Sequence, residues 1–185
     1  MIYLKFVLFA IIKAVLFLTL PFAMVIVPLF TRAQSHDKPI YTWGGWWGTY
    51  DNPPQGDEGY VSKRCMFPNV LTGIRGYINR ALWMWRNKLY GYNAFASVKY
   101  GADVSVEHTG NPDISDKYKV PGHYIARAFK GKKLIGFEFY AVWPWSKRRN
   151  LRIRLGWKIL TRKFEQYGFA QLVTTANPLD GYGND

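Results

Sequence analysis

The N-terminal segment is the feature that most restricts how this chain can fold. Lys5 and Lys13 are the only charged residues in its first 31 positions, and Ala14–Thr31 is uncharged and almost wholly apolar. Eighteen helical residues rise about 27 Å, which is close to the hydrocarbon thickness of a bilayer. Membrane helices also tolerate prolines such as Pro21 and Pro28. We therefore predict a transmembrane anchor over residues 1–31.

Two alternatives to an anchor stay open. The segment can be the buried helix of a soluble protein, or it can be a signal peptide cleaved near Thr31-Arg32-Ala33. The apolar run is longer than a normal signal core, and Arg32 does not suit a cleavage site. These two features favour an uncleaved anchor.

The charge of the chain indicates an anionic neighbour. The net charge is +13, and of 25 Lys and Arg only two precede residue 32, so 23 face 12 acids in the remainder. Such a balance favours a polyanion or an anionic membrane surface, and the anionic cytoplasmic leaflet would hold it well. We expect a single-pass protein with the bulk of the chain in the cytoplasm. Cys65 is the single cysteine, which excludes an intrachain disulfide.

A tryptophan-rich stretch, Tyr41–Tyr60, dominates the region 32–68. It combines three Trp with glycines, the pair Pro53–Pro54 and several acids, so we interpret it as a rigid folded loop that packs against the core or the lipid headgroups. A docking loop is the alternative, with Trp46, Trp47, Asp57 and Glu58 as its candidate interaction residues. Its acids match no metal-loop spacing, so we predict no metal site and no cofactor.

Apolar residues at spacings of three and four predict an amphipathic helix over residues 70–90. Its apolar stripe consists of Leu71, Ile74, Ile78, Leu82, Trp85 and Leu89. Such a helix either packs on a sheet or lies in the membrane interface with Trp83, Met84 and Trp85 at headgroup depth.

The last third of the chain predicts an antiparallel meander at 122–160. Gly122–Phe129, Leu134–Trp143 and Leu151–Ile159 are rich in β-branched and aromatic residues. Setting Trp143 opposite Leu151 gives the sheet one apolar face and one basic face. Short strands are expected at 96–100 and 102–107, and Thr174–Asp185 is expected to be a mobile tail.

One acid stands out in the meander. Glu138 is the only acid within residues 122–163, and the register sets it opposite Gly156 with Arg154 and Lys158 as diagonal neighbours. We predict a partly exposed structural ion pair of Glu138 with Arg154 and Lys158 rather than a catalytic acid.

The chain offers little material for catalysis. The acids Asp51, Asp57, Glu58 and Glu107 and the residue His108 form no recognisable nucleophile–base pair, so we predict no catalytic residues and no enzyme activity. The basic residues Lys147, Arg148, Arg149, Arg152 and Arg154 form a candidate interaction surface instead. With Trp145 or Tyr140 stacking on bases, the same residues can serve a nucleic-acid-binding protein.

Together these elements predict an α+β fold. The expected regions are an anchor at 1–31, a loop region at 32–68 and a basic α+β domain at 69–185. The anchor, the DNPPQGDEGY loop and the FEFYAVWPW…LRIRLGWKI hairpin resemble a family of uncharacterised proteins encoded by tailed bacteriophages and prophages. This resemblance implies a phage origin and expression in a bacterial host, and it implies no catalytic residues.

The expected function is that of a membrane-anchored accessory protein at the host inner membrane. Its partners would be the anionic leaflet and an unknown host or phage protein. A membrane-tethered nucleic-acid-binding protein and a lysis-related membrane protein remain alternatives.

Overall fold

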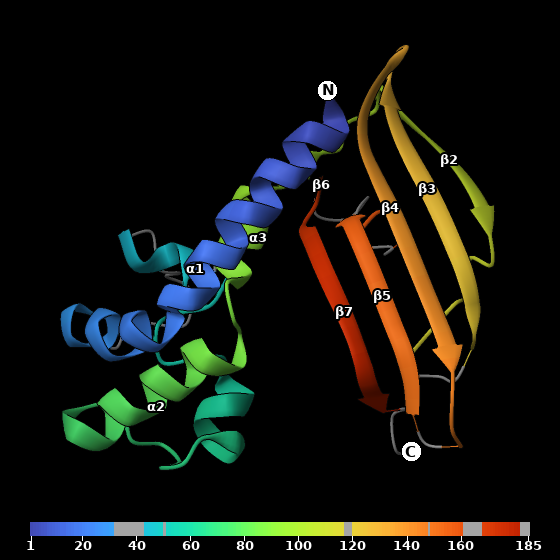
Figure 1. Ribbon diagram of the computed structural model, residues 1–185. Coiled ribbons are helices and arrows are strands. Elements are labelled where there is room, and N and C mark those ends of the chain that lie inside the picture. Colours follow the sequence, from blue (N-terminus) through green and yellow to red (C-terminus); the bar gives the residue numbers. More distant parts are fainter. Residues whose placement is uncertain (32–42, 50, 117–119, 148, 161–167, 182–185) are drawn as a thin grey trace. The chain divides into compact units, whose positions relative to one another are not determined.

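The computed structural model describes residues 1–31, 43–49, 51–116, 120–147, 149–160 and 168–181 (Figure 1). The chain forms two compact units. The helical unit contains Leu8–Phe95, and the sheet unit contains Met1–Val7 together with Ala96–Asp185. The N-terminal helix and the antiparallel sheet confirm the α+β class. The alternative cleavage site at residues 31–33 and the basic residue Arg148 fall wholly or partly outside the described residues.

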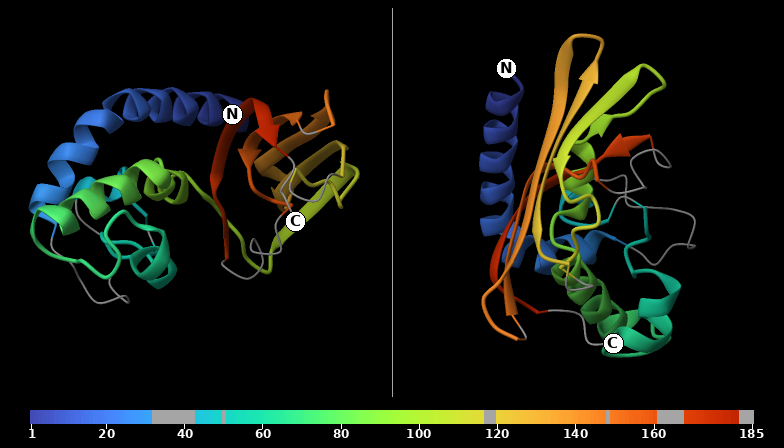
Figure 2. Two further views of the ribbon diagram at one scale, coloured as in Figure 1. Left: turned by 90° about the horizontal axis from the view of Figure 1, so that it is seen from below. Right: turned by 90° about the vertical axis from the view of Figure 1, so that its right-hand side faces the viewer.

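The helical unit is built on most of the N-terminal helix α1 (Ile2–Phe30). A 3₁₀ turn η1 (Trp43–Trp46), a π-helical turn η2 (Tyr60–Arg64) and the helices α2 (Gly73–Arg86) and α3 (Tyr90–Phe95) follow it. Figure 2 shows that α1 changes direction along its length, which Pro21 and Pro28 inside the helix explain because proline removes a backbone N–H.

The sheet unit is a five-stranded antiparallel meander in the order β2-β3-β4-β5-β7. Its strands are β2 (Val104–Gly110), β3 (Gly122–Lys130), β4 (Lys133–Pro144), β5 (Arg149–Trp157) and β7 (Leu172–Gly181). A two-stranded ribbon pairs β1 (Val98–Lys99) with β6 (Phe169–Ala170). The prediction of a mobile tail from Thr174 was wrong for the described part, because β7 pairs with β5 as an edge strand.

The predicted register is the observed one. Trp143 lies opposite Leu151, and Glu138 lies opposite Gly156. Gly156 adopts a φ of +105°, and a Cβ there would come within 2.1 Å of the Phe137 carbonyl oxygen, so only glycine fits this point of the hairpin. Because side chains alternate along each strand, this register determines which residues of β4 and β5 share a face.

The apolar face of the sheet is not its more buried face. Small and polar side chains form the more buried face, whereas Trp143 on the apolar face is 45 % exposed. The buried residues of the first face are Tyr124, Ala126, Ala128, Gly136, Glu138, Tyr140 and Val142. Segments outside the strands reach this face, since the Leu160 backbone N–H donates to Glu138 and the Asp116 backbone N–H donates to Tyr140.

Helix α2 also leaves apolar side chains exposed. Its predicted apolar stripe is largely exposed, with Ile74 71 % and Trp85 42 % accessible. Its buried positions instead include Asn79, Arg80 and Met84. The predicted boundaries at residues 31 and 68 do not coincide with the two units, because α2 belongs with α1 and the tryptophan-rich loop rather than with the sheet.

Candidate functional site

The tryptophan-rich loop is packed against helices of its own unit. The indole Nε1 of Trp47 donates to the Leu16 carbonyl oxygen at 3.2 Å and contacts Thr19 Oγ1 at the same distance. Trp46 packs against the rings of Tyr92 and Phe95, at centroid distances of 5.8 and 5.2 Å, and remains 41 % exposed. The loop therefore partly buries Trp47 and leaves Trp46 more exposed.

Glycines allow this packing. The Gly91 backbone N–H donates to the Gly48 carbonyl oxygen at 2.8 Å, and a Cβ on Gly91 would lie 1.8 Å from the Gly45 carbonyl oxygen. Two backbone segments meet here at a distance that excludes a side chain.

The two predicted acids of the loop differ in surroundings. Asp57 Oδ1 accepts a hydrogen bond from the Tyr60 backbone N–H at 2.7 Å and so caps the helical turn that follows. Glu58 is exposed. The described residues contain no group of three His, Cys, Asp or Glu that would hold a metal ion.

The predicted basic residues divide into an exterior and an interior set. Lys147 and Arg149 are exposed at the β4–β5 turn, where Arg149 Nη1 donates to the Leu179 carbonyl oxygen. Arg152 and Arg154 point into the buried face of the sheet and form ion pairs there. The tryptophan-rich loop and these basic residues belong to different units.

An ion-pair network occupies the buried face. Glu138, which is fully buried, accepts a hydrogen bond from Arg154 Nε at 2.5 Å and another from the Leu160 backbone N–H at 2.7 Å. The Arg154 guanidinium also lies over the Tyr140 ring, 4.6 Å from its centroid. Lys158 follows the end of β5, and its backbone N–H donates to Gln171.

Tyr140 extends the network to a second acid. Its hydroxyl donates to Asp116 Oδ1 at 2.7 Å, and Arg152 pairs with the other oxygen of Asp116. Burial, reinforced by the hydrogen bond to Asp116, raises the pKa of Tyr140 to about 12. The phenol therefore stays neutral at physiological pH, and the network is arranged to hold the sheet together.

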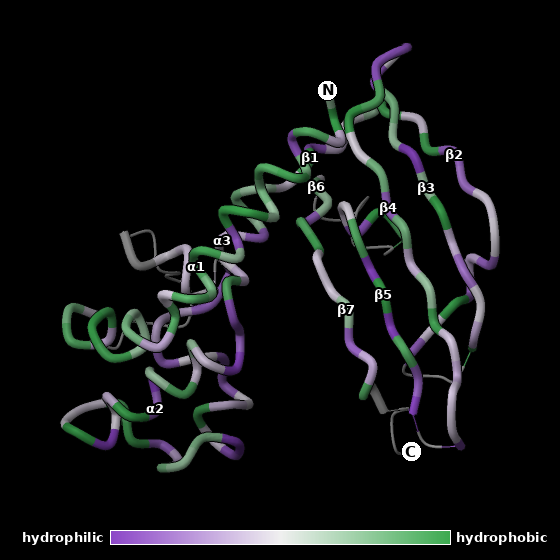
Figure 3. The backbone as a smooth tube through the Cα atoms, viewed as in Figure 1, coloured by the Kyte–Doolittle hydropathy of each residue, from purple (hydrophilic) through white to green (hydrophobic). Residues whose placement is uncertain are grey.

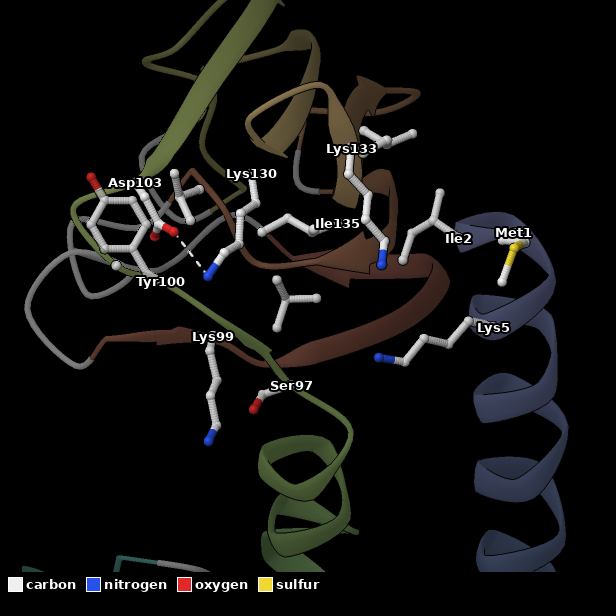
Figure 4. A pocket seen from close by; sticks show the side chains of 14 residues that line it. Met1, Ile2, Lys5, Ser97, Lys99, Tyr100, Asp103, Lys130, Lys133 and Ile135 are labelled. Atoms are coloured by element: carbon white, nitrogen blue, oxygen red, sulfur yellow. Dashed lines mark ion pairs between the residues drawn. The ribbon is translucent and has the colours of Figure 1, made fainter.

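The sheet unit also contains a cavity of about 600 Å³ (Figure 4). Its wall combines the apolar residues Ile2, Val98, Val104, Leu134 and Ile135 with the four lysines Lys5, Lys99, Lys130 and Lys133. Asp103 is its one carboxylate and pairs with Lys130 at 2.8 Å, and this hydrogen bond holds the pKa of Asp103 below its ordinary value. An apolar wall with an excess of ammonium groups suits a molecule with an anionic head and an apolar tail.

Helix α1 presents an apolar surface within the helical unit. Most of its large exposed residues fall on one side of the helix and carry no charge; they are Leu8, Ile11, Val15, Leu18, Phe22, Val25, Ile26 and Leu29, here called the α1 stripe. Phe17 and Phe30 are exposed as well. Leu16, Leu20, Ala23 and Val27 lie on the other side and are buried. The described residues contain one helix that is long and apolar enough to cross a membrane, and it is α1.

A comparison with known protein families identifies the family of this chain. A model described as a family of unknown function, DUF7338, matches residues 1–184. The chain belongs to this family. No curated protein and no solved structure matches the DUF7338 chain.

Sequence reasoning missed several residues that the DUF7338 fold brings together. Asp116 lies 36 positions before Arg152 in the chain, and no local pattern marks it as a partner. The cavity lysines likewise come from α1, β1, the end of β3 and the start of β4. The surplus of Lys and Arg in the sheet region was visible in the sequence, but their convergence depends on the fold.

Proposed function

We propose that this DUF7338 protein is a non-catalytic accessory protein that attaches to the host inner membrane through α1 and holds a partner there with its basic sheet unit. The observation that carries the proposal is the α1 stripe, whose members Leu18 and Phe22 are 74 % and 71 % exposed. Exposed apolar patches of this extent mark interaction sites in soluble surroundings, and a bilayer is the natural environment of an uncharged stripe.

Several contacts support retention of α1 in the mature protein. Three of its carbonyl oxygens accept hydrogen bonds from side chains elsewhere in the helical unit. Tyr92 donates to Phe9, Tyr77 donates to Val25, and Arg80 donates to Pro28. A cleaved signal peptide would leave these donors, and the apolar cluster of Ala23, Val27 and Met84, without their partners. The uncleaved anchor is therefore the alternative that the packing favours.

The sheet unit offers a surface for a protein partner. Its apolar face is only half covered, with Trp143 and Ile125 45 % and 36 % exposed, and Arg127 lies on the same face. The exposed cations Lys147 and Arg149 flank the hairpin end nearby. This combination fits a host or phage protein with an apolar patch and an acidic rim.

Several of the residues expected to contact nucleic acid are paired or buried within the protein. Arg152 and Arg154 are engaged in ion pairs, and Tyr140 is buried. Lys147, Arg149 and the exposed Trp145 remain, and they are a small surface for phosphate contacts and stacking. A phage origin remains part of the proposal through the resemblance of the anchor, loop and hairpin sequences.

The α1 stripe provides the experiment. Replacing Leu18 and Val25 by Asp adds two charges, each at roughly 2.5–3.5 kcal/mol for Asp near the bilayer centre and less at shallower depth. Both side chains point away from the helical unit, so the variant should fold and move from the membrane fraction to the soluble fraction of bacterial cells.

The matched control places the same two charges on the exposed strand β2, as Ser105→Asp with Thr109→Asp. This control should remain in the membrane fraction. If the unmodified protein is soluble, or if both double variants behave alike, the proposal is overturned.

A further inference from the structure

We infer that α1 lies within one leaflet of the membrane rather than crossing it, so that both units are on the same side. This inference rests on the proposed membrane attachment and specifies its geometry. Two independent observations carry it: the connectivity of the sheet unit and the charges of the segments packed along α1.

The first observation is that the two ends of the chain share one unit. Met1–Val7 and Ala96–Asp185 belong together. The Tyr3 and Phe6 rings contact the Phe137 ring at centroid distances of 4.9 and 5.2 Å, and Phe6 contacts Trp157 at 6.0 Å. The first turn of α1 is therefore on the same side of the membrane as the sheet.

A chain that leaves one side and returns to it crosses an even number of times. If α1 crossed once, a second span would have to bring the chain back between residue 31 and residue 96. That segment contains no second uncharged apolar run, and its helix α2 carries Arg75, Arg80 and Arg86. Because the first turn of α1 lies on the same side of the membrane as the sheet, and because no second span brings the chain back, α1 does not cross the membrane.

The second observation concerns the middle of α1. Trp47 bonds to Leu16 of the helix, and Tyr77 and Arg80 of α2 bond to its carbonyl oxygens at Val25 and Pro28. If this part of α1 spanned the hydrocarbon, the attached segments would lie there too. Their exposed charges include Lys63, Arg64, Arg75, Arg86 and Lys88, and each costs about 2.5–3.5 kcal/mol at the bilayer centre.

An in-plane helix avoids this cost. Figure 3 shows α1 as almost continuously hydrophobic. Most of its exposed large side chains along the helical unit belong to the α1 stripe, and Lys5 and Lys13 fall outside the stripe by the 3.6-residue period of the helix. Twenty-nine residues extend about 43 Å, which exceeds the hydrocarbon thickness but is unrestricted along the surface. The net charge of +13 complements an anionic leaflet and argues for a bilayer as occupant rather than a second, equally basic copy.

Depth along the stripe gives a direct test. Single cysteines replace Leu8, Leu18 and Leu29 in the full chain with Cys65→Ala, each carries a bimane fluorophore, and the protein is bound to vesicles of phosphatidylethanolamine and phosphatidylglycerol. Lipids that carry bromine atoms near the headgroup or near the ends of their acyl chains quench the bimane fluorescence, and the comparison of the two gives the depth of each position. We expect the same shallow depth at all three positions, whereas a spanning helix places Leu18 deepest.

Sidedness gives the second readout. Two exposed residues, Glu58 in the helical unit and Lys132 in the sheet unit, are replaced by cysteine as Glu58→Cys and Lys132→Cys. Spheroplasts that contain either variant are then treated with an impermeant maleimide. We expect both to be protected until the cells are permeabilised. Labelling of one site but not the other, or a deep Leu18 between shallow ends, overturns the inference while leaving membrane attachment intact.

The remaining outcomes are also distinct. Absence of the protein from membranes refutes the proposed function itself. If brominated lipid quenches none of the fluorophores on the α1 stripe, and if cysteines on the stripe cross-link between two copies of the chain, the stripe is a dimer interface and the inference is overturned.

Discussion

Glu138 is the residue whose surroundings differ most from the sequence-based expectation. An exposed ion pair contributes less than about 1 kcal/mol, but Glu138 is fully buried and its partner Arg154 is 17 % exposed. Replacing Glu138 by Gln leaves the guanidinium without its counter-charge in the covered face of the sheet. Because breaking a buried pair is costly, we expect a loss of about 3 kcal/mol of unfolding free energy.

Chemical denaturation of the detergent-solubilised full chain measures this loss. Glu107→Gln on exposed β2 is the control and should change the free energy of unfolding little. The double variant Glu138→Gln with Arg154→Met should lose less than the two single variants combined, since neither charge is then buried alone. Additive losses would show that the two side chains do not interact.

Tyr140 gives a pH dependence at the same scale. Its pKa is raised from 10.0 to about 12 in the folded protein, so the protonated phenol stabilises the fold below pH 10 and this contribution disappears as the pH rises from 10 to 12. The unfolding free energy should fall across this window. Tyr140→Phe should show a shallower fall, although Tyr60, with a pKa of about 12, retains part of it. Equal slopes for the two proteins would contradict a buried neutral phenol.

The contact between the tryptophan-rich loop and α3 is a prediction at the scale of elements. Gly91→Ala forces apart two backbones that now meet at Gly45, and this displaces the loop that carries Trp46. We expect about 2 kcal/mol of lost stability and an altered tryptophan emission spectrum. Gly131→Asn in the β3–β4 turn is the control, because Gly131 has a φ of +57° with open space around it and asparagine tolerates this conformation. A Gly91→Ala variant as stable as this control would refute the close approach.

At this scale the sequence was a good guide to elements and a poor guide to their faces. Alternating β-branched and aromatic residues located β3, β4 and β5 within two residues at each end, and the pairing of Trp143 with Leu151 followed from one hairpin. Burial depended on what covers each face. The sheet is covered where Asp116 contacts Tyr140 and Leu160 contacts Glu138, and these contacts join residues 24 and 22 positions apart. Local periodicity contains no information on such partners.

Helix α2 illustrates the same limit. Its stripe of Ile74, Leu82 and Trp85 has the period of a buried face, yet the protein buries Asn79 and Arg80 instead. Asn79 bridges the backbone of Phe67 and Val70, and Arg80 bonds to Leu71 and Pro28. A buried polar side chain is acceptable when its bonds are complete, and these bonds are visible only in three dimensions. An apolar stripe left outside is expected for a helix beside a membrane.

At the scale of the whole molecule, the first turn of α1 should be needed for the sheet unit. Phe6 is half-buried between Phe137 and Trp157, so Phe6→Ala removes aromatic contacts from the sheet and should cost about 2 kcal/mol. Leu4→Ala, at a side chain that is 73 % exposed, should cost much less. Proteolysis of the sheet unit in the two variants measures the difference, and equal resistance would show that the N-terminal turn does not support the sheet.

The division of the chain has a consequence for the order of folding during synthesis. Leu8–Phe95 is continuous, so the helical unit can form as soon as its last residue leaves the ribosome. The sheet unit is discontinuous, and Phe6 must wait for Trp157 to be made about 150 residues later. Contacts of such long sequence separation form slowly because the intervening loop must first close. The N-terminal turn is thus translated long before its partners in the sheet and is among the last parts to reach its place, and until then its aromatic side chains are free to engage lipid.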